Sequence, residues 1–223
     1  MLPEGFVLID KPQGWSSFDV VKKCRGLFKE RKIGHLGTLD PMATGLLVLA
    51  LGSATKQISK YMGLEKEYEV EMELGKRSDT YDAEGQIEEV VVSDWPSFEQ
   101  VEQALSSFWG TTQQVPPAFS AKWVGGKRAY QLARKGREVK LEAVTVEMQG
   151  SDLAYDAPIV RFKVRVSSGT YVRSLVHDLG QQLGTGAILT SLRRTKVGEW
   201  SVDSATTIPQ LMAARDASSP HST

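Results

Sequence analysis

The chain has 223 residues, of which 41% are hydrophobic and 24% charged, so it can bury a sizeable core without covalent cross-links. Its formal net charge is zero and its single cysteine is Cys24, which excludes an intramolecular disulfide and a cysteine-rich zinc site. The longest apolar run, residues 46–51, is far shorter than the ~20 residues of a membrane span, and no basic leader precedes an apolar segment at the N-terminus, so we expect a soluble cytoplasmic protein.

The N-terminal part of the chain predicts a strand, a helix and a second strand. Residues 6–9 are apolar and end at the turn sequence KPQG, and Ser16 or Ser17 can cap a helix that continues to about Phe28. Residues 46–51 form an apolar run between two glycines, which is typical of a buried strand. A short helical stretch is expected after it.

The middle of the chain alternates strand and helix patterns without a regular period. In residues 66–75 every second residue is apolar or aromatic and glutamates lie between, which predicts a strand with one face in water. Residues 98–108 have the apolar spacing of one helix face, closed by Gly110. The proline-, glycine- and cation-rich residues 111–136 predict a long functional excursion with a short helix near residues 129–134.

Strand patterns return near the C-terminal end, at residues 139–148 and 162–166. The sequence SSGTY is then expected to cap a helix that carries Leu175, Leu179 and Leu183. The tail DASSPHST is expected to be disordered. This mixture of strands and helices favours an α+β fold over a doubly wound parallel sheet.

Cations gather in three parts of the sequence, although the net charge is zero, and residues 65–102 are strongly acidic. The clusters are Lys22, Lys23, Arg25, Lys29, Arg31 and Lys32; Lys122, Lys127, Arg128, Arg134, Lys135, Arg137 and Lys140; and Arg161, Lys163, Arg165, Arg173, Arg193, Arg194 and Lys196. One such cluster is usually a solvated face, but three beside an acidic segment favour a surface that follows phosphates.

The densest motif is GHLGTLDPMATGLLVLALG, residues 34–52. Glycines and a proline surround Asp40 just before the apolar strand, so this loop can hold the carboxylate in a fixed pose. The local alternative is a helix or turn cap, because Asp followed by Pro is ordinary in turns. Taken alone, the loop favours that alternative.

The loop does not stand alone. GHLGTLDPMATGLL resembles the motif of TruB-type pseudouridine synthases, and further segments of that family follow in its order over most of residues 6–198. These segments are DKPQGWSS, KEYEVEMELG, SDTYDAEG, PPAFSAKWVGGKRAYQLARKG, SSGTYVRSL and LRR. Several independent segments in one order are more specific than a single catalytic pattern.

The resemblance implies a role for seven residues. It makes Asp40 the essential carboxylate, Tyr68 the aromatic that stacks on the target base, and Arg173 the cation that pairs with Asp40. His35 is expected against the RNA where a base has been pulled out. The residues expected to line or support the pocket are Lys11, Tyr171 and Leu192. Each of these residues also has an ordinary structural interpretation when it is taken singly. Tyr68 and Leu192 can be core residues, and Arg173 can be a surface cation on a helix. His35 can be a turn residue, and Lys11 can be a solvent-exposed lysine.

The resemblance also implies fold, reaction and partners. The fold is a pseudouridine synthase fold with a mixed, largely antiparallel central sheet, flanking helices and an RNA-gripping insertion. We expect a catalytic domain over residues 1–200 and a short C-terminal stub over residues 201–223. The reaction is isomerisation of uridine 55 in the T-arm loop of tRNA, after the nucleotide is flipped out. We expect a monomer that needs no metal, no cofactor and no protein partner.

The sequence departs from the family pattern in two places. Leu36 and Thr38 stand where the family often has a threonine and a small residue, which affects RNA contacts but leaves His35 and Asp40 in place. We expect the C-terminal RNA-binding PUA-type domain of many relatives to be missing or reduced to a stub, which bears on substrate affinity.

Two rival functions and one mechanistic choice stay open. The rivals are a non-catalytic RNA-binding or RNA-folding module, and a pseudouridine synthase that works in a guide-RNA complex. The carboxylate can act as a nucleophile at the sugar or as a base towards it. GQQLGTG, residues 180–186, is interpreted as a helix end rather than a dinucleotide site, and His177 as a helix-surface residue rather than a metal ligand.

Overall fold

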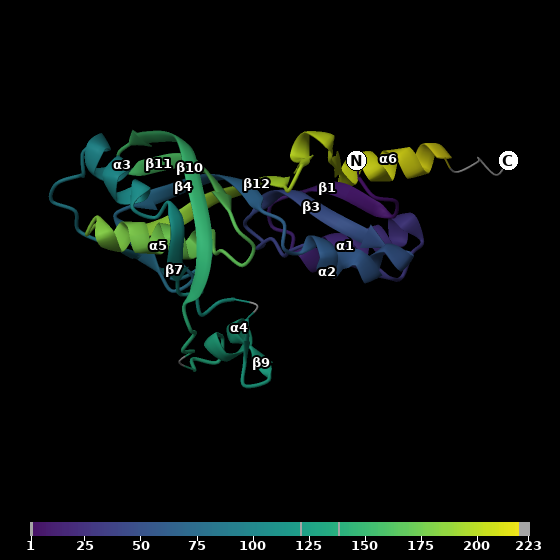
Figure 1. The fold of residues 1–223 in the computed structure, drawn as a ribbon, viewed down its shortest axis with the longest axis horizontal. Coiled ribbons are helices and arrows are strands. Elements are labelled where there is room, and N and C mark those ends of the chain that lie inside the picture. The colour runs from purple at the N-terminus through teal and green to yellow at the C-terminus, as the bar shows by residue number, and fades with distance from the viewer. Residues whose placement is uncertain (1, 121, 138, 219–223) are drawn as a thin grey trace. The chain divides into compact units, whose positions relative to one another are not determined.

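The computed structural model describes residues 2–120, 122–137 and 139–218 (Figure 1). The chain forms two compact units. The first combines Met1–Tyr68 with Leu192–Thr223, and the second is Glu69–Ser191. Strands β4 (Lys66–Leu74) and β12 (Ala187–Val197) contribute residues to both.

The first unit is a small sheet with helices, and its strands are ordered β14-β1-β3-β12-β4. Helix α6 lies beside β1 and α1 (Figure 1). The elements of this unit are β1 (Phe6–Lys11), α1 (Ser17–Phe28), β2 (Ile33–His35), β3 (Thr44–Leu51), a 3-10 turn (Gly52–Gln57), α2 (Ile58–Tyr61), β13 (Trp200–Ser201), β14 (Thr206–Thr207) and α6 (Ile208–Ser218).

Helix α1 begins where the serine pair predicts. Ser16 is the N-cap, because its side chain accepts a hydrogen bond from the backbone N–H of Asp19 and the Asp19 carboxylate accepts one from the backbone N–H of Ser16. This reciprocal pair satisfies two donors that a helix start would otherwise leave without a partner. The second serine, Ser17, is buried and serves the loop described below.

Strand β3 lies in the centre of the first unit and is buried except at its two end residues. It pairs antiparallel with β1 from Phe6 opposite Ala50, and parallel with β12 at two residue pairs, Arg193 with Thr44 and Arg194 with Gly45. A Cβ at Gly45 would lie 2.3 Å from the carbonyl oxygen of Arg194, and φ at Gly45 is +97°. Both the close approach and the left-handed backbone therefore require glycine.

The core of this unit is one apolar cluster beside an aromatic trio. The rings of Phe6, Tyr61 and Trp200 lie with centroids 5.3 to 6.2 Å apart, in tilted and edge arrangements that aromatic quadrupoles favour. The buried members of the cluster are Phe6, Leu8, Leu36, Leu46, Val48, Ala50, Ala54 and Val197.

The second unit has a sheet in the order β12-β4-β11-β10-β7. Strand β10 pairs antiparallel with both β11 and β7. The remaining elements of this unit are β5 (Lys76–Ser78), β6 (Ile87–Glu89), α3 (Phe98–Ser106), β7 (Gly110–Gln114), β8 (Trp123–Val124), β9 (Lys127–Arg128), α4 (Ala129–Ala133), β10 (Val144–Asp156), β11 (Ile159–Val166) and α5 (Val172–Gln182). Helix α3 contacts β10 and α5, helix α4 contacts β9, and β5 with β6 and β8 with β9 form two short hairpins.

Strand β3 pairs parallel with β12, and β1 pairs parallel with β14, whereas β1 with β3, β2 with β3, β10 with β11 and β10 with β7 are antiparallel. This confirms the predicted α+β class with a mixed, mostly antiparallel sheet. The alternation in β4 is confirmed as well, since Lys66 and every second residue after it are buried. Figure 1 shows the excursion with α4 and β9 standing away from the strands of the second unit.

Two local predictions are wrong at their boundaries, and a third differs in how the helix is capped. The strand expected from residue 139 begins only at Val144. Helix α5 begins directly after SSGTY, as predicted, but its N-cap, Tyr171, makes no side-chain cap hydrogen bond and donates its backbone N–H to the side chain of Gln114. Helix α6 continues to Ser218, so the first residues of the tail expected to be disordered are helical, and residues 219–223 lie outside the described part.

No helix among the described residues is both long and apolar enough to cross a membrane.

Candidate active site

The loop between β2 and β3 presents Asp40. The carbonyl oxygen of Asp40 accepts a 3.1 Å hydrogen bond from the backbone N–H of Ala43, which closes a tight turn with Pro41 at its second position. Proline suits this position because its ring fixes φ near the required value. Leu39 and Met42 are buried on either side, while Asp40 itself is partly exposed. The main chain of Asp40, rather than its carboxylate, makes the turn.

Arg194 holds this loop from inside the first unit. Its side chain is 1% exposed. Its Nε donates to the carbonyl of Leu46 (2.7 Å), and its two terminal nitrogens donate to the carbonyls of Gly37 (3.2 Å) and Thr38 (3.4 Å). One rigid guanidinium therefore ties together main-chain positions on both sides of Asp40.

Two further buried side chains fix the same loop. The hydroxyl of Ser17 accepts from the backbone N–H of Leu39 (2.8 Å) and donates to its carbonyl (3.1 Å). Lys11 is fully buried, and its ammonium group donates to the carbonyls of Pro41 (3.3 Å) and Trp15 (2.5 Å). The interpretation of Lys11 as a solvent lysine is therefore wrong, and the pocket role implied by the resemblance stays a prediction.

His35 ends β2 at the entrance to the loop, paired with Leu49 of β3. Burial lowers the pKa of His35, and the positive charge of Arg194 lowers it further. The imidazole is therefore neutral at pH 7. Its Nδ1 atom is buried and finds no hydrogen-bond partner within the described part of the chain.

Lys66 is a buried cation that the sequence did not single out. Its ammonium group donates to the carbonyls of Met62 (2.9 Å) and Leu64 (2.5 Å). Burial, with a further contribution from Arg194, lowers its pKa from 10.5 to about 8. Its Cε lies 3.9 Å from the position of a Cβ built on Gly37, so Lys66 reaches the loop that carries Asp40.

We expect the free energy of unfolding to rise as pH increases from 8 to 9. In that window native Lys66 releases its proton while the unfolded lysine, with its pKa near 10.5, keeps it, so the unfolded state binds more protons and stability grows with pH. The window closes at 9 because burial raises the pKa of Cys24 from 9.0 to about 11, which acts in the opposite sense. Urea unfolding at several pH values measures the rise, and Lys66→Met should flatten it; an unchanged slope in the variant would contradict the assignment.

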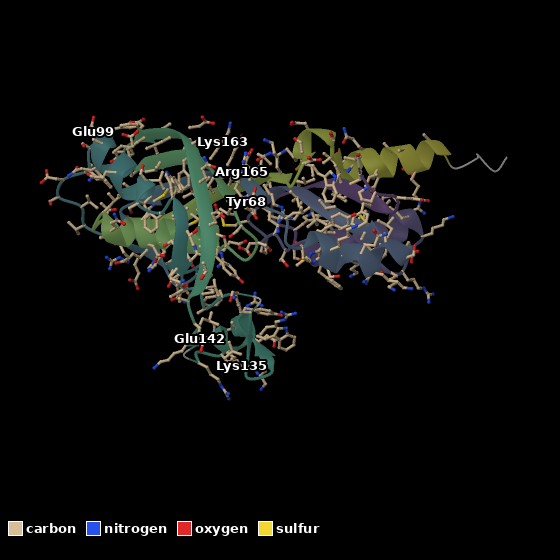
Figure 2. The ribbon with its side chains drawn as sticks, viewed as in Figure 1. Tyr68, Glu99, Lys135, Glu142, Lys163 and Arg165 are labelled. Atoms are coloured by element: carbon tan, nitrogen blue, oxygen red, sulfur yellow. The ribbon has the colours of Figure 1, made fainter. Side chains whose placement is uncertain are left out.

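Tyr68 and Leu192 are buried on their strands. Tyr68 lies two positions after Lys66, on the buried face of β4 that also contacts the loop, and Figure 2 labels it. Leu192 lies two positions before Arg194, on the buried face of β12. Both positions agree with a core role, and the pocket role implied by the resemblance stays a prediction.

In the second unit, Arg173 lies in the first turn of α5 and is buried, so its interpretation as a surface helix cation is wrong. Its terminal nitrogens donate to the carbonyls of Thr80 and Phe119, each at 2.9 Å. Its Nε lies 3.6 Å from the carboxylate of Asp82, and both side chains are at least 94% buried. These contacts fix the direction of the guanidinium.

Tyr171 precedes Arg173 as the N-cap of α5. Its backbone is held twice by one amide side chain, since its N–H donates to Oε1 of Gln114 (2.8 Å) and its carbonyl accepts from Nε2 (3.0 Å). Gln114 is itself buried at the end of β7. The backbone of Tyr171 thus anchors the start of the helix that carries Arg173.

The seven predicted residues divide between the two units. The first unit contains Lys11, His35, Asp40, Tyr68 and Leu192, and the second contains Tyr171 and Arg173. The predicted pairing of Arg173 with Asp40 joins the two units and stays a prediction. Residues that the sequence interpretation missed are Ser17, Lys66, Asp82 and Arg194. Asp82 and Arg194 lie in segments that resemble the family, SDTYDAEG and LRR, but a polar residue type alone does not reveal burial.

The third basic cluster is largely engaged with carboxylates or buried, so its role in a surface that follows phosphates stays a prediction. Most of its members are paired with carboxylates or buried, which leaves little of their charge for a partner. The pairs are Arg161 with Glu71 (2.7 Å), Lys163 with Asp152 (3.1 Å), Arg173 with Asp82 (3.6 Å), Arg193 with Asp10 (2.8 Å) and Lys196 with Glu67 (3.2 Å), while Arg194 is buried.

The second basic cluster lies on the excursion between β7 and β10 and has the surface character that was predicted. Trp123 is 64% exposed, with the guanidinium of Arg128 4.2 Å from its ring centre, and Arg134 lies over the ring of Tyr130. Lys135, labelled in Figure 2, is exposed on the same excursion. Aromatic rings beside cations are the combination that single-stranded nucleic acids bind.

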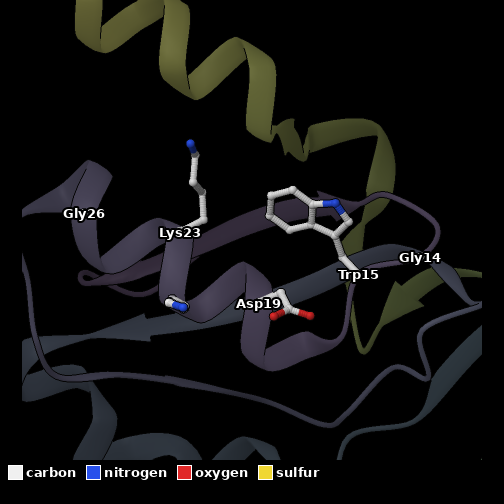
Figure 3. A pocket seen from close by; sticks show the side chains of 6 residues that line it. Gly14, Trp15, Asp19, Lys23 and Gly26 are labelled. Carbon is white, nitrogen blue, oxygen red and sulfur yellow. The ribbon is translucent and has the colours of Figure 1, made fainter.

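The first basic cluster borders a depression of about 550 Å³ on α1 (Figure 3). The N–H of Gly14, at one end of the depression, donates to the carbonyl of Pro41 (2.8 Å), which connects it to the Asp40 loop. Lys22 and Lys23 lie farther along the helix. The residues around the depression are Gly14, Trp15, Asp19, Lys22, Lys23 and Gly26.

Comparison with known proteins identifies family models and relatives that match this sequence. Residues 25–172 match the model of the TruB family pseudouridylate synthase N-terminal domain, and residues 173–220 match that of the tRNA pseudouridylate synthase B C-terminal domain. The chain is 44% identical over 217 residues to tRNA pseudouridine synthase B of Chloroherpeton thalassium, covering 94% of this chain and 90% of that protein. It is 46% identical over 216 residues to tRNA pseudouridine synthase B of Solibacter usitatus, covering 96% of this chain and 74% of that protein.

Solved structures share the fold. A chain in the crystal structure of a Cbf5-Nop10-Gar1 complex matches with a TM-score of 0.69 and 30% identity, over 91% of this chain and 52% of its own length. A chain in an H/ACA RNP bound to a substrate RNA containing 2'-deoxyuridine matches with a TM-score of 0.71 and 27% identity, over 97% and 56%. The present chain thus spans about half the length of these two.

The family models cover residues 25–220, and both relatives are more than 40% identical over nearly the whole chain. The sequence motifs, the mixed sheet and these matches agree. The chain therefore belongs to the TruB family of pseudouridine synthases, which are isomerases.

Proposed function

We propose that the protein converts uridine 55 in the T-arm loop of tRNA to pseudouridine, with Asp40 as its essential carboxylate. The observation that carries the proposal is the fixed loop around Asp40. Arg194, Ser17 and Lys11 hold its main chain from the buried side, while Asp40 keeps partial exposure. A preorganised carboxylate at a surface is what attack on a bound sugar requires.

The reaction breaks the bond between the sugar C1' and the uracil N1, turns the base, and joins its C5 to the same C1'. The proton on C5 leaves, N1 gains one, and no electron or external group is exchanged. Asp40 serves this sequence either by attacking C1', as the nucleophile of a retaining glycosidase does, or by removing a proton from the sugar. Both routes need the ionised carboxylate.

The other predicted residues have environments that suit their proposed roles. Arg173, held by two carbonyls and Asp82, is proposed to pair with Asp40 and keep it ionised. Tyr68 is proposed to stack on the detached uracil. Neutral His35 is proposed to occupy the place of the extruded nucleotide, whose unstacking costs a few kcal/mol.

The excursion between β7 and β10 is proposed to grip the RNA. Its exposed Trp123 and the cations around it offer a stacking surface and phosphate contacts. Relatives carry tRNA pseudouridine synthase B as their name, which supports tRNA as the substrate. The depression on α1 lies next to the Asp40 loop and adds two lysines to the face available to RNA.

The test is tritium release from a tRNA transcript made with uridine tritiated at C5. The purified protein alone is expected to release one equivalent of tritium per tRNA, and to release none from a transcript with cytidine at position 55. Binding without release would instead favour an RNA-binding or RNA-folding module. Release only after a guide RNA is added would favour a guide-dependent synthase.

A further inference from the structure

Tyr81 and His177 form a stacked ring pair in the second unit. Their ring centres are 3.8 Å apart and their planes differ by 12°. His177, interpreted from the sequence as a helix-surface residue rather than a metal ligand, is partly exposed, and Tyr81 covers one face of its ring. Tyr81 lies between β5 and β6 and His177 lies on α5, so the stack joins a loop to a helix.

The same helix holds the neighbours of Tyr81 through Arg173. Arg173 donates to the carbonyl of Thr80 and lies 3.6 Å from the carboxylate of Asp82, the residues on either side of Tyr81. Residues four apart on a helix share a face, so Arg173 and His177 approach residues 80–82 together. Arg173 contacts the main chain of Thr80 and the side chain of Asp82, and His177 contacts the ring of Tyr81 between these two residues.

The backbone at Tyr81 is in a conformation that needs support. Its φ is +65°, in the left-handed region that bulky side chains rarely adopt. The carbonyl of Tyr81 accepts from the N–H of Leu189 (3.0 Å), so the segment is also tied to β12. A stacked aromatic pair contributes a free energy of the same order as the cost of a single left-handed residue.

We propose that Tyr81 and His177 are positioning residues, whose stack holds residues 80–82 in the geometry that directs the guanidinium of Arg173. The part of this inference that concerns turnover rests on the proposed function, in which Arg173 pairs with Asp40. Neither ring needs to touch the RNA. Loss of the stack lets Thr80 and Asp82 move, and the guanidinium loses its fixed direction.

The charges around the pair are consistent with a neutral stack at pH 7. Burial lowers the pKa of His177, and Arg77 on β5 lowers it further. Burial raises the pKa of the Asp178 carboxyl to about 6, and burial together with Asp178 raises the pKa of the Tyr81 phenol. An uncharged imidazole lying on an uncharged phenol needs no counter-ion.

The kinetic test uses paired variants that keep or remove a ring. Tyr81→Gly relieves the left-handed backbone but removes the stack, and His177→Ala removes it from the other side. Both are expected to lower kcat for pseudouridine formation about 10-fold while leaving the Kd for tRNA within about 2-fold, and the double variant should be no worse than either single one. Tyr81→Phe and His177→Phe keep two rings and should retain kcat within about 2-fold of the wild type. Exposed Gln181→Ala on the same helix is the control.

A second measurement needs no activity. In protein labelled with ¹⁵N-arginine, the buried Nε–H of Arg173 should give a slowly exchanging resonance that Arg173→Lys identifies by its loss. His177→Ala is expected to speed its exchange at least about 10-fold, whereas His177→Phe should not. This readout remains if Tyr81→Gly fails to fold.

The outcomes separate this inference from the proposed function. If the wild type forms no pseudouridine, the proposed function fails, and the Arg173 exchange alone decides the positioning claim. If the wild type is active and the ring-removing variants match it in kcat and in exchange, the positioning claim is overturned. A lower melting temperature with unchanged kcat and unchanged Arg173 exchange also overturns it, because the stack is then only structural.

Discussion

Asp40→Asn is expected to lower the rate of pseudouridine formation on the order of 10⁴-fold, as when a carboxylate is lost from a catalytic triad. The change removes one negative charge at nearly constant shape. The turn that carries Asp40 is closed by its carbonyl, and Arg194 binds other residues of the loop, so the fold should survive. Tritium release under single-turnover conditions measures the chemical step, and filter binding measures the Kd for tRNA.

The control for this prediction is the same chemical change at an exposed site of the same unit. Asp203→Asn should leave the single-turnover rate within about 2-fold of the wild type, because its side chain is exposed and contacts only Ser201 in the described structure. The Kd for tRNA should stay within about 3-fold in both variants, since neither change removes a cation that binds phosphate. An Asp40→Asn protein with full turnover would refute the assignment of Asp40.

Asp82→Asn is expected to destabilise the protein by about 3 kcal/mol and to lower kcat as well. Asp82 accepts from the hydroxyl of Thr80 (2.6 Å) and the N–H of Glu84 (3.0 Å), and its second oxygen faces Arg173 at 3.6 Å. Removing one charge of a buried pair leaves the other in a medium of low polarity, which usually costs about 3–5 kcal/mol. Urea unfolding measures the stability, and tritium release measures the activity.

A surface ion pair provides the comparison for Asp82. Asp152 lies 3.1 Å from Lys163, and both side chains are about half exposed. Asp152→Asn should change the free energy of unfolding by less than about 1 kcal/mol, because solvent screens such a pair. Equal effects of the two substitutions would show that burial of the Asp82–Arg173 pair contributes nothing. In a double-mutant cycle, Arg173→Met should cost less in the Asp82→Asn background than alone.

Local patterns in the sequence predicted much of the fold. The alternation in residues 66–74 identified β4, the apolar run after Gly45 identified β3, and the serine pair at residues 16 and 17 identified the start of α1. These features depend on periodicity and capping, which act over a few neighbouring residues. The start of β10 and the end of α6 were misjudged because pairing with β7 and packing on α1 decide them.

The candidate site was predictable only in part, and for a similar reason. Asp40 has a recognisable loop, and the order of the motifs added the other residues that the family uses. The sequence does not reveal which polar residues are buried. Arg194, Lys66 and Asp82 have no unusual neighbours in the sequence, and only the folded structure shows that they are buried. The ion pairs of the third basic cluster could not be predicted either, because its cations meet carboxylates from distant segments.

The way Arg194 binds the loop bears on how freely this region can vary between related proteins. Its three acceptors are the backbone carbonyl oxygens of Gly37, Thr38 and Leu46. Every amino acid supplies such an oxygen, so these hydrogen bonds do not depend on side-chain identity. The side chain at an exposed loop position such as Thr38 can therefore be changed without loss of these hydrogen bonds and without a shift of Asp40, two residues away. Related proteins can therefore differ in the exposed side chains that this loop offers to an RNA while the loop backbone keeps the same conformation.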